Sequence, residues 1–495
     1  MATIASDVQT YYNYIGGAWR ESASGETFLD TNPARPGDVL GRFQKSNAAD
    51  VDAAIRAAEA ALPAWRALPA PERGEIIFKA ALLLEQHLEE LAQLLTREMG
   101  KILLEARGDV YTAINFGKYV AGEGRRAEGE TVPSAQADKM CMTIRQPLGV
   151  VGIITPWNFP LAIPAWKVFP ALLAGNTVVL KPASDTPLLS TKLVEILAEA
   201  GLPPEVLNLV TGPGGTLGDA LVTDKRVAMI SLTGSTEVGK RVAELCGRDL
   251  RRCSLELGGK NAILIMEDAN LEEAAAGVAW AGFGTTGQRC TATSRVIIHR
   301  SRLNEFQERI VAAAEQQRVG NGLDPEITMG PLVNAGRVSA VHAYTEIGKQ
   351  EGAQLLTGGR AYSEGLLAEG AFYAPTVFSG VTPDMRIARE EIFGPVLSVL
   401  PVNSYDEAIE VANSTEYGLS CAMYTEDMRT VFRAMRDLQT GLLYFNAPTT
   451  GAEPHLPFGG VKASGNGHRE LGHVAVEEFS ELKTVFVSYP APKRP

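Results

Sequence analysis

Short apolar runs that alternate with helical segments dominate the sequence from residue 148 onward, and this pattern constrains the fold most strongly. Near-continuous β-branched runs separated by helices are typical of a parallel sheet that helices cover on both faces. The expected strands up to residue 232 are 150–155, 177–180, 206–210 and 228–232, and the expected helices are 161–174, 187–200, 215–222 and 236–246.

The same alternation resumes after Gly258-Gly259, which predicts two successive α/β units divided near residue 257. Residues 49–62 and 72–106, ahead of both units, have helical periodicity. The expected strands of the second unit are 262–266, 296–298, 396–400, 419–424 and 441–445, and the expected helices are 270–281, 301–317, 404–413 and 428–438.

Two segments have no obvious partner in either unit. The polar segment 125–145 contains Pro133 and is predicted to form a protruding hairpin, and residues 484–488 follow a polar loop as a last strand. Unpaired strand edges invite pairing with another chain, so we expect these segments to take part in an oligomer.

Composition removes several classes of function. The 495 residues carry a net charge of −12, which is unfavourable for a nucleic-acid binder. The most apolar stretch, 150–180, contains four prolines and is not a membrane span, and the N-terminus lacks a signal-peptide pattern, so we expect a cytoplasmic protein. The five cysteines form no C-x-x-C and the six histidines no H-E-x-x-H, so neither a disulfide framework nor a metal site is predicted.

Cys290 is the strongest candidate for a reactive side chain. The preceding segment 282–287 is a literal G-x-G-x-x-G, but it follows a helix rather than a strand, which is wrong for a dinucleotide fingerprint. It is better interpreted as a tight turn that presents Cys290. With Arg289 beside it, the thiol is a candidate thiolate nucleophile; the alternative is an inert buried cysteine.

Glu256 and Asn158 are candidates for a base and an oxyanion donor. Glu256 lies between two leucines and precedes two glycines, so burial is expected to raise its pKa towards neutrality. Asn158 directly follows a core strand, at the edge where α/β proteins place their sites. The alternatives are an exposed glutamate at a strand end and a turn asparagine that bonds its own backbone.

Residues 234–240, Gly-Ser-Thr-Glu-Val-Gly-Lys, nearly match a phosphate-binding P-loop. Arg241 follows where Mg²⁺ coordination needs Ser or Thr, which argues against nucleotide hydrolysis. The segment still opens a helix after a strand, so its free N–H groups suit a pyrophosphate. A plain strand-to-helix turn remains the alternative.

Taken together and in order, seven segments resemble the aldehyde dehydrogenase superfamily over nearly the whole chain. The segments are Pro156-Trp-Asn-Phe-Pro160, Leu180-Lys-Pro-Ala-Ser184, Gly234-Ser-Thr-Glu-Val-Gly239, Leu255-Glu-Leu-Gly-Gly259, Gly287-Gln-Arg-Cys290, Glu391-Ile-Phe-Gly-Pro395 and Pro457-Phe-Gly-Gly-Val-Lys462. The resemblance implies an NAD(P)⁺-dependent enzyme with two Rossmann-like parallel-sheet domains and a small β oligomerisation arm. This arm would form a sheet between subunits in a homodimer or homotetramer. It implies a cofactor-binding domain of residues 1–124 and 146–257, a catalytic domain of residues 258–446, and bridging segments 125–145 and 447–495.

The resemblance also assigns roles to residues. Cys290 attacks the aldehyde, Asn158 holds the oxyanion, Glu256 activates water, and Lys167 with Glu470 forms a possible proton relay. Members that transfer the acyl group to coenzyme A generally lack the glutamate, so Glu256 favours a free acid product over an acyl-coenzyme A product. The presence of Cys290, Glu256 and Asn158 together argues against a second alternative, a non-enzymatic structural protein on this fold. The implied cofactor-binding residues are Ile154, Thr155, Pro156, Trp157, Lys181, Ser184, Gly234, Ser235, Leu257, Glu391 and Phe393.

The sequence constrains the cofactor preference and the substrate less strongly than it constrains the family. Ser184 stands where NAD⁺-preferring relatives often carry a glutamate, so a 2′-phosphate meets no repulsion; NADP⁺ is expected slightly ahead of NAD⁺. Phe159, Trp166, Arg289 and Thr291 match positions around the family's substrate tunnel. Arg289 is a candidate partner for a substrate carboxylate or phosphate, or else a structural arginine. The favoured substrate is a small aldehyde, specifically a semialdehyde such as 2,5-dioxopentanoate.

Overall fold

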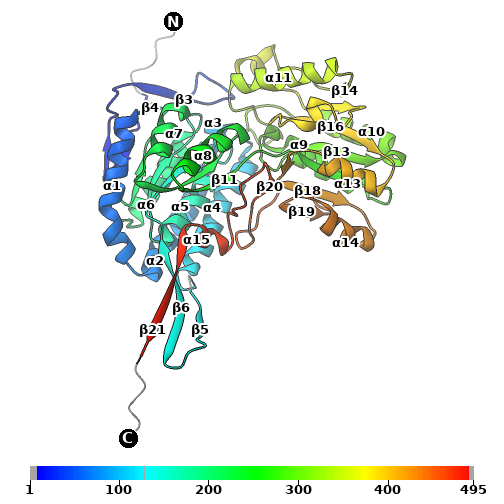
Figure 1. Ribbon diagram of the computed structural model, residues 1–495. Coiled ribbons are helices and arrows are strands. Elements are labelled where there is room, and N and C mark those ends of the chain that lie inside the picture. The colour runs from blue at the N-terminus through cyan, green and yellow to red at the C-terminus, as the bar shows by residue number, and fades with distance from the viewer. Residues whose placement is uncertain (1–7, 127–128, 490–495) are drawn as a thin grey trace.

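The computed structural model describes residues 8–126 and 129–489. Two seven-stranded, mainly parallel sheets form the body of the molecule, and a three-stranded sheet projects from it (Figure 1). The expected α/β class with two parallel-sheet units and a small β arm is confirmed. The expected division near 257 falls between the last strand of one large sheet and the first strand of the other.

The first sheet is parallel in its centre and ends in an antiparallel hairpin, β1 and β2. Its strands, in spatial order, are β11 (Arg252–Glu256), β10 (Val227–Thr233), β7 (Val150–Ile154), β8 (Thr177–Lys181), β9 (Leu207–Leu209), β1 (Asn13–Ile15) and β2 (Ala18–Arg20). Burial of β7 and β8 on both sides explains why their sequences are apolar throughout.

Helices cover both faces of this sheet, and each face has its own apolar core. One face carries α1 (Ala48–Ala67), α7 (Gly214–Thr223) and α8 (Thr236–Arg248). The other carries α5 (Ala162–Leu173) and α6 (Pro187–Glu199), with α2 (Ala70–Gln86), α3 (Leu88–Met99) and α4 (Leu103–Glu123) packed outside them.

The second sheet is parallel except for its first edge strand. Its strands, in spatial order, are β14 (Gln354–Thr357), β15 (Thr376–Ser379), β16 (Val396–Val402), β13 (Thr293–His299), β12 (Asn261–Ile265), β18 (Ser420–Tyr424) and β19 (Leu442–Phe445). Its helices are α9 (Leu271–Phe283), α10 (Leu303–Glu315), α11 (Ala335–Gln350), α12 (Arg386–Arg389), α13 (Tyr405–Asn413) and α14 (Met428–Asp437).

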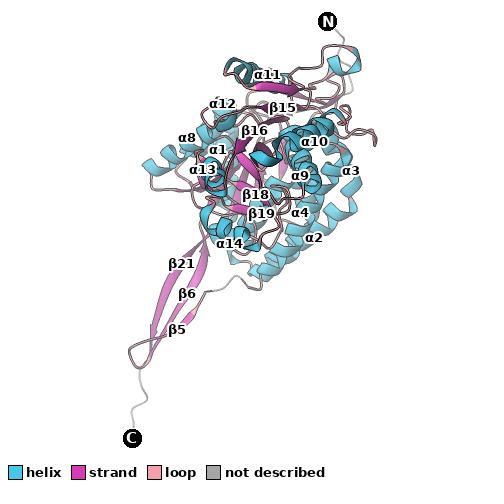
Figure 2. Cartoon of the chain, turned by 90° about the vertical axis from the view of Figure 1, so that its right-hand side faces the viewer, coloured by secondary structure: helices cyan, strands magenta, loops and turns pink. Residues whose placement is uncertain are grey.

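The two segments without expected partners pair with each other. Strand β21 (Ser480–Ser488) runs antiparallel to β6 (Lys139–Pro147) over nine residue pairs, and β5 (Thr131–Pro133) adds to the far side of β6. The resulting β arm extends away from the body (Figure 2). The other strands form two short pairs, β3–β4 (Thr27–Thr31, Val39–Gln44) and β17–β20 (Tyr417–Gly418, Val461–Lys462). The last α-helix is α15 (Val474–Glu478).

The structure adds detail where the expectations from the sequence were coarse. The periodic stretch 72–106 lies in three helices, because the chain turns at His87 and again at Gly100, which caps α3 in the left-handed conformation (φ 96°). Between residues 318 and 395, where no helix or strand was expected, the chain forms elements that include α11, β14, β15 and α12. Among residues 8–126 and 129–489, none of the helices combines the length and apolar character that a bilayer crossing requires.

Candidate active site

Cys290 follows a tight turn that presents it, as the sequence predicts. The turn is a short 3₁₀ segment, η1 (Gly284–Gly287), in which Thr285 and Thr286 have positive φ angles. Gly287 also has a positive φ (69°), and a Cβ there would lie 2.2 Å from the carbonyl oxygen of Gly394. Only glycine fits this position. The close approach of Gly287 to Gly394 packs the Gly-Gln-Arg-Cys segment against the Glu-Ile-Phe-Gly-Pro segment.

Asn261 fixes the backbone of Cys290 and was not identified from the sequence. Its Nδ2 donates to the carbonyl oxygens of Cys290 (2.7 Å) and Ala292 (2.9 Å), while its Oδ1 accepts the N–H of Ser420 (3.0 Å). The side chain is buried at the start of β12. The only signal in the sequence was its place directly after Leu-Glu-Leu-Gly-Gly-Lys.

Asn158 lies against the same loop. Its Nδ2 donates to the carbonyl oxygen of Gln288 at 3.0 Å, which leaves the second amide hydrogen available. Its Oδ1 is buried and has no hydrogen-bond partner among the described residues. The sequence-based alternative of a turn asparagine bonded to its own backbone is therefore wrong.

Glu256 ends strand β11 and is buried rather than exposed. Neither carboxyl oxygen has a hydrogen-bond partner within residues 8–126 and 129–489. Burial, followed by the nearby Glu470 carboxyl, raises the pKa of Glu256 well above its usual range. Gly459 (φ 149°) permits this packing, because a Cβ there would lie 2.5 Å from Glu256 Oε1.

Lys167 and Glu470 form a buried ion pair beside Glu256. Lys167 also donates to the hydroxyl of Ser231 at 2.9 Å. Its ammonium group lowers the pKa of Glu256, but less than burial and Glu470 raise it. The structure therefore brings together the three residues that the resemblance connects as a base and a relay.

Arg289 does not provide the cationic neighbour expected for Cys290. Its guanidinium pairs with Glu105 at 2.6 Å, donates to Thr285 Oγ1 at 3.0 Å and stacks on Trp280. Burial, with smaller effects from Glu256 and other carboxylates, raises the pKa of the Cys290 thiol to about 12. In this state the cysteine is a thiol, so its activation requires a base. Glu105 was not identified from the sequence.

A cavity with an empty volume of about 1380 Å³ opens onto Cys290 from one side. Glu256 and Glu470 are among the residues that line it. Trp166 Nε1, although buried, has no hydrogen-bond partner among the described residues. All four residues expected around a substrate tunnel line this cavity, namely Phe159, Trp166, Arg289 and Thr291.

A second cavity, with an empty volume of about 870 Å³, reaches Cys290 from the other side. Cys290, Thr233 and Leu257 line both cavities, so the thiol lies where they meet. Of the residues expected to bind a cofactor, those that line this second cavity are Pro156, Trp157, Gly234, Ser235, Leu257, Glu391 and Phe393.

The second cavity has the chemistry that a nicotinamide dinucleotide needs. Ser235 caps the N-terminus of α8, and the first backbone N–H groups of a helix suit a bound anion. Trp157 and Phe393 meet edge to face at 5.3 Å, and Glu391 Oε1 accepts the N–H of Gly259 at 2.9 Å. A pyrophosphate, an aromatic ring and a ribose each find a suitable partner.

Four of the expected cofactor residues, Ile154, Thr155, Lys181 and Ser184, lie outside the lining of that cavity. Ile154 and Lys181 end the neighbouring strands β7 and β8. Ser184 Oγ donates to the carbonyl oxygen of Gly212 at 2.8 Å. Lys181 donates to the carbonyl of Pro182, and burial lowers its pKa to about 8. Their contacts with a cofactor stay a prediction.

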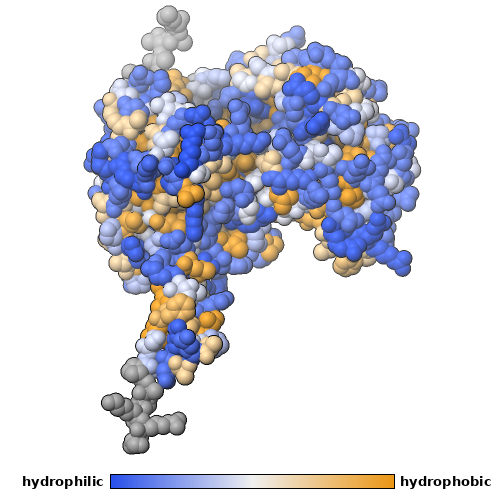
Figure 3. Space-filling model, viewed as in Figure 1, coloured by the Kyte–Doolittle hydropathy of each residue, from blue (hydrophilic) through white to orange (hydrophobic). Residues whose placement is uncertain are grey.

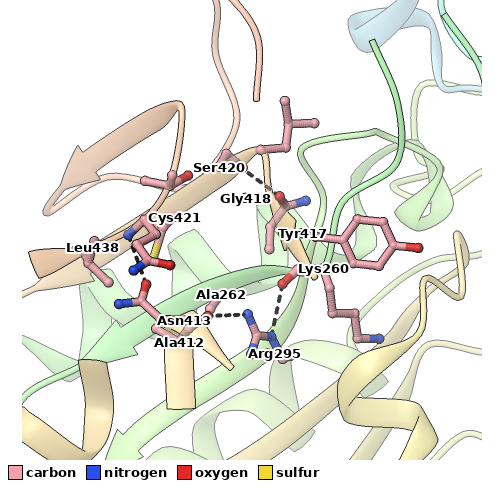
Figure 4. A pocket seen from close by; sticks show the side chains of 14 residues that line it. Lys260, Ala262, Arg295, Ala412, Asn413, Tyr417, Gly418, Ser420, Cys421 and Leu438 are labelled. Atoms are coloured by element: carbon pink, nitrogen blue, oxygen red, sulfur yellow. Dashed lines mark hydrogen bonds between the residues drawn. The ribbon is translucent and has the colours of Figure 1, made fainter. Parts of the chain in front are cut away.

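A smaller hollow beside β12 is a packing feature rather than a second site (Figure 4). Buried Arg295 donates to the carbonyl oxygens of Lys260 (3.0 Å), Val411 (2.9 Å) and Ala412 (2.9 Å), which ties β13 to α13. The ammonium group of Lys260 points away from Arg295 (Figure 4). With its donors used in this way, Arg295 has no evident role towards a ligand.

Comparisons with known proteins agree with this site. The model of the aldehyde dehydrogenase family matches residues 19–485. Alpha-ketoglutaric semialdehyde dehydrogenase of Bacillus subtilis is 42% identical and covers 98% of this chain and 99% of its own. 2,5-Dioxopentanoate dehydrogenase of Saccharolobus solfataricus is 43% identical, with coverage of 96% and 99%. The crystal structure of Staphylococcus aureus betaine aldehyde dehydrogenase in complex with NAD⁺ has a TM-score of 0.95 at 33% identity, with coverage of 98% and 96%.

Similar solved structures include complexes with NAD⁺ and an enzyme described as NADP-dependent. Both cofactors are therefore within the range of this fold, in agreement with the sequence-based prediction. Identity of this size over nearly the full length exceeds what a shared fold alone would produce. The chain belongs to the aldehyde dehydrogenase family, and it oxidises an aldehyde to the carboxylic acid with NAD⁺ or NADP⁺.

Proposed function

We propose that Cys290 is the nucleophile of this reaction, and the meeting of two cavities at its thiol carries the proposal. The aldehyde enters through the larger cavity, and the Cys290 sulfur adds to its carbonyl carbon to give a thiohemiacetal. The free amide hydrogen of Asn158 and the backbone N–H of Cys290 stabilise the resulting oxyanion.

Glu256 serves as the base in two steps. It takes the proton of the Cys290 thiol, whose raised pKa makes a base necessary. After losing that proton to solvent, it takes a proton from the water that adds to the acyl-cysteine. The C–S bond then breaks with its electron pair on sulfur, the acid is released, and the proton on Glu256 returns to the sulfur as the Cys290 thiol. Its two unpartnered, buried carboxyl oxygens line the same cavity as the thiol, which suits both tasks.

The smaller cavity holds the dinucleotide. Gly234 and Ser235 bind the pyrophosphate at the start of α8, Glu391 binds the nicotinamide ribose, and Trp157 with Phe393 encloses the ring. When bound, the nicotinamide accepts the hydride that leaves the substrate carbon. The protein excludes water there and keeps the acyl group on Cys290 until hydrolysis.

Substitution of the nucleophile tests this mechanism. Cys290→Ala removes the only covalent acceptor proposed for the substrate, so aldehyde oxidation should fall at least ~10³-fold while NAD(P)⁺ binding changes little. Steady-state assays and cofactor fluorescence titrations measure the two effects. A Cys290→Ala enzyme with comparable activity would contradict the covalent mechanism.

A semialdehyde with a carboxylate, such as 2,5-dioxopentanoate, is the proposed substrate. Two relatives of more than 40% identity are named for this compound. The larger cavity also contains Arg289, whose pairing with Glu105 leaves N–H groups free to bind a carboxylate. A panel of aldehydes should give the highest kcat/KM with 2,5-dioxopentanoate, and a preference for uncharged aldehydes would contradict the proposal.

Transfer of the acyl group to coenzyme A is the alternative reaction. The presence of Glu256 favours water as the acceptor, because family members that transfer the acyl group to coenzyme A generally lack a glutamate at this position. Product analysis with and without coenzyme A distinguishes them, because the proposed reaction yields the free acid at the same rate in both. A structural role without catalysis would leave Cys290→Ala indistinguishable from the wild type.

We also infer a cytoplasmic homodimer or homotetramer. The β arm exposes apolar side chains on both faces, and these gather on the projection at the lower end of Figure 3. Within residues 8–126 and 129–489, strand β21 is an edge strand of the arm sheet, and such an edge can pair with a second copy. Five free cysteines suit a reducing compartment. The exposed side chains of the arm are Val132, Met140, Ile144, Leu482, Phe486 and Val487.

A further inference from the structure

A row of polar side chains lies on one face of the first sheet, beneath the larger cavity. Parallel register places Ser231 beside Ser254 and Thr233 beside Glu256. Because side chains alternate along a strand, all four lie on the same face. Thr233 Oγ1, Ser254 Oγ and both carboxyl oxygens of Glu256 are buried without hydrogen-bond partners among the described residues. Such a group of unpartnered polar atoms is suited to ordered water.

Three charged side chains pack over this row. Lys167 of α5 donates to Ser231 and pairs with Glu470, as described above. Glu478, the last residue of α15, places its carboxyl group beside the hydroxyl of Ser254. The Glu478 side chain is only 4% exposed, and its Oε1 has no hydrogen-bond partner in the part of the chain that the structure describes.

His468 connects this buried region with solvent. Its Nδ1 lies 3.7 Å from Glu478 Oε1, and its side chain is 40% exposed. Neither residue lines the two cavities that meet at Cys290. The pair therefore extends from the polar row towards the surface without lining either cavity.

We propose that Glu478 and His468 form the outer part of a proton path from Glu256 to solvent. The inference rests on the proposed function of Glu256 as base. Once the acyl-enzyme has formed, Glu256 carries the proton that it took from the Cys290 thiol. Glu256 must lose that proton to solvent before it can take one from water. The proton that it takes from water returns to the Cys290 sulfur when the C–S bond breaks. The path leads through Glu470 and Lys167 to Glu478, and then through His468 to bulk water.

The charges around both groups suit proton transfer near neutral pH. Burial and Glu470 raise the pKa of Glu478 to about 8, against the opposing effects of Ser254 and Lys167. The carboxyl group is therefore largely protonated at pH 7 and can donate. Burial lowers the pKa of His468, as do two arginines, so its ring is neutral and can accept. These arginines are Arg252 of β11 and Arg469 of the neighbouring loop.

Glu478→Gln tests the path because it keeps the shape of the side chain and removes its exchangeable carboxyl proton. In weak buffer, hydrolysis of an aryl acetate without cofactor should slow about tenfold to hundredfold, whereas single-turnover acylation of Cys290 stays unchanged. Added imidazole should restore much of the rate, which a packing defect would not allow. His468→Asn should show the same rescue with a smaller loss.

Glu477→Gln is the matched control, since Glu477 is the adjacent glutamate and its side chain is 46% exposed. It should hydrolyse the ester at the wild-type rate. A Glu478→Gln enzyme with wild-type rate and pH profile, or a loss that imidazole leaves unchanged, would overturn the path. Glu256→Gln separates the two proposals: if it is slow while Glu478→Gln is not, only the path is wrong, and if both are fast, the base is wrong as well.

Discussion

At the scale of single residues, the protonation of Glu256, the proposed base, should control the hydrolytic step. Burial raises its pKa well above the usual range, so the carboxylate that acts as base forms at a higher pH than the carboxylate of an exposed glutamate. Hydrolysis of the acyl-enzyme should therefore accelerate with rising pH above the range in which an exposed glutamate titrates. Glu256→Gln should give a burst of NAD(P)H followed by turnover ~10²-fold or more slower, with a flat pH profile. Stopped-flow absorbance measures both phases, and a steady rate unchanged by the substitution would mean that another group is the base.

Ser184 is predicted to decide whether the protein accepts a 2′-phosphate on its cofactor. A carboxylate at this position would repel that phosphate, and at an effective dielectric of ~20 two charges ~4 Å apart interact by about 4 kcal/mol before solvation losses. We expect the wild type to use NADP⁺ with kcat/KM at least comparable to that with NAD⁺. Ser184→Glu should shift the preference to NAD⁺ through the KM for NADP⁺, because the contact is equal in ground and transition states.

Ser184→Gln is the control for this substitution, since it adds the same bulk without the charge. It should leave the ratio of kcat/KM values closer to the wild type than Ser184→Glu does. A wild type that strongly rejects NADP⁺ would contradict the assignment. So would a ratio that is identical in both variants, because steric change rather than charge would then explain it.

At the scale of elements, the loop that carries Cys290 depends on strand β12. Asn261→Ala would remove two donors and leave the carbonyls of Cys290 and Ala292 without them, at a cost of about 1–3 kcal/mol. We expect kcat to fall more than KM rises, since the thiol shifts relative to Asn158. Circular dichroism should show an intact fold. A variant with reduced thermal stability but normal kcat would assign Asn261 a purely structural role.

The sequence predicts the strands and helices of the two sheets well because their apolar runs are buried on both sides. β7, β8 and α5 begin and end within one or two residues of the expected bounds. Regions with weaker patterns are missed: α11 has buried residues at only a few positions, and β1 and β2 form a short edge hairpin. Tertiary contacts decide such segments, and no local pattern predicts them.

The candidate site, too, was predictable from the sequence only in part. Cys290, Glu256 and Asn158 are in local motifs, and the structure places them around the cavities. The partner of Arg289 was not predictable, because Glu105 is 184 residues away in sequence and meets it only when α4 packs beside η1. The expectation that the Arg289 cation lies beside the Cys290 thiol was wrong for this reason. Contacts between distant elements decide electrostatics that sequence spacing does not encode.

At the scale of the whole molecule, the β arm is the part least explained by a single chain. Leu482, Phe486 and Val132 lie on one face of its sheet: β21 residues alternate, and Val132 and Phe486 both pair with Cys141. These three side chains are 58%, 62% and 45% exposed. An exposed apolar face on a projecting sheet with a free edge is unfavourable in a monomer, and a second copy is the simplest way to cover it.

The double substitution Leu482→Glu with Phe486→Glu should therefore dissociate the assembly. It places two charges on the face to be buried, while the backbone pairing of β21 with β6 continues. Light scattering should show a dimer or tetramer for the wild type and a smaller species for the variant, with NAD(P)⁺ binding retained because the cavities lie in the body. Leu366→Glu, at an exposed leucine outside the arm, should leave the assembly intact. A monomeric wild type at micromolar concentration would refute the role of the arm, and a variant of unchanged size would mean that another surface joins the copies.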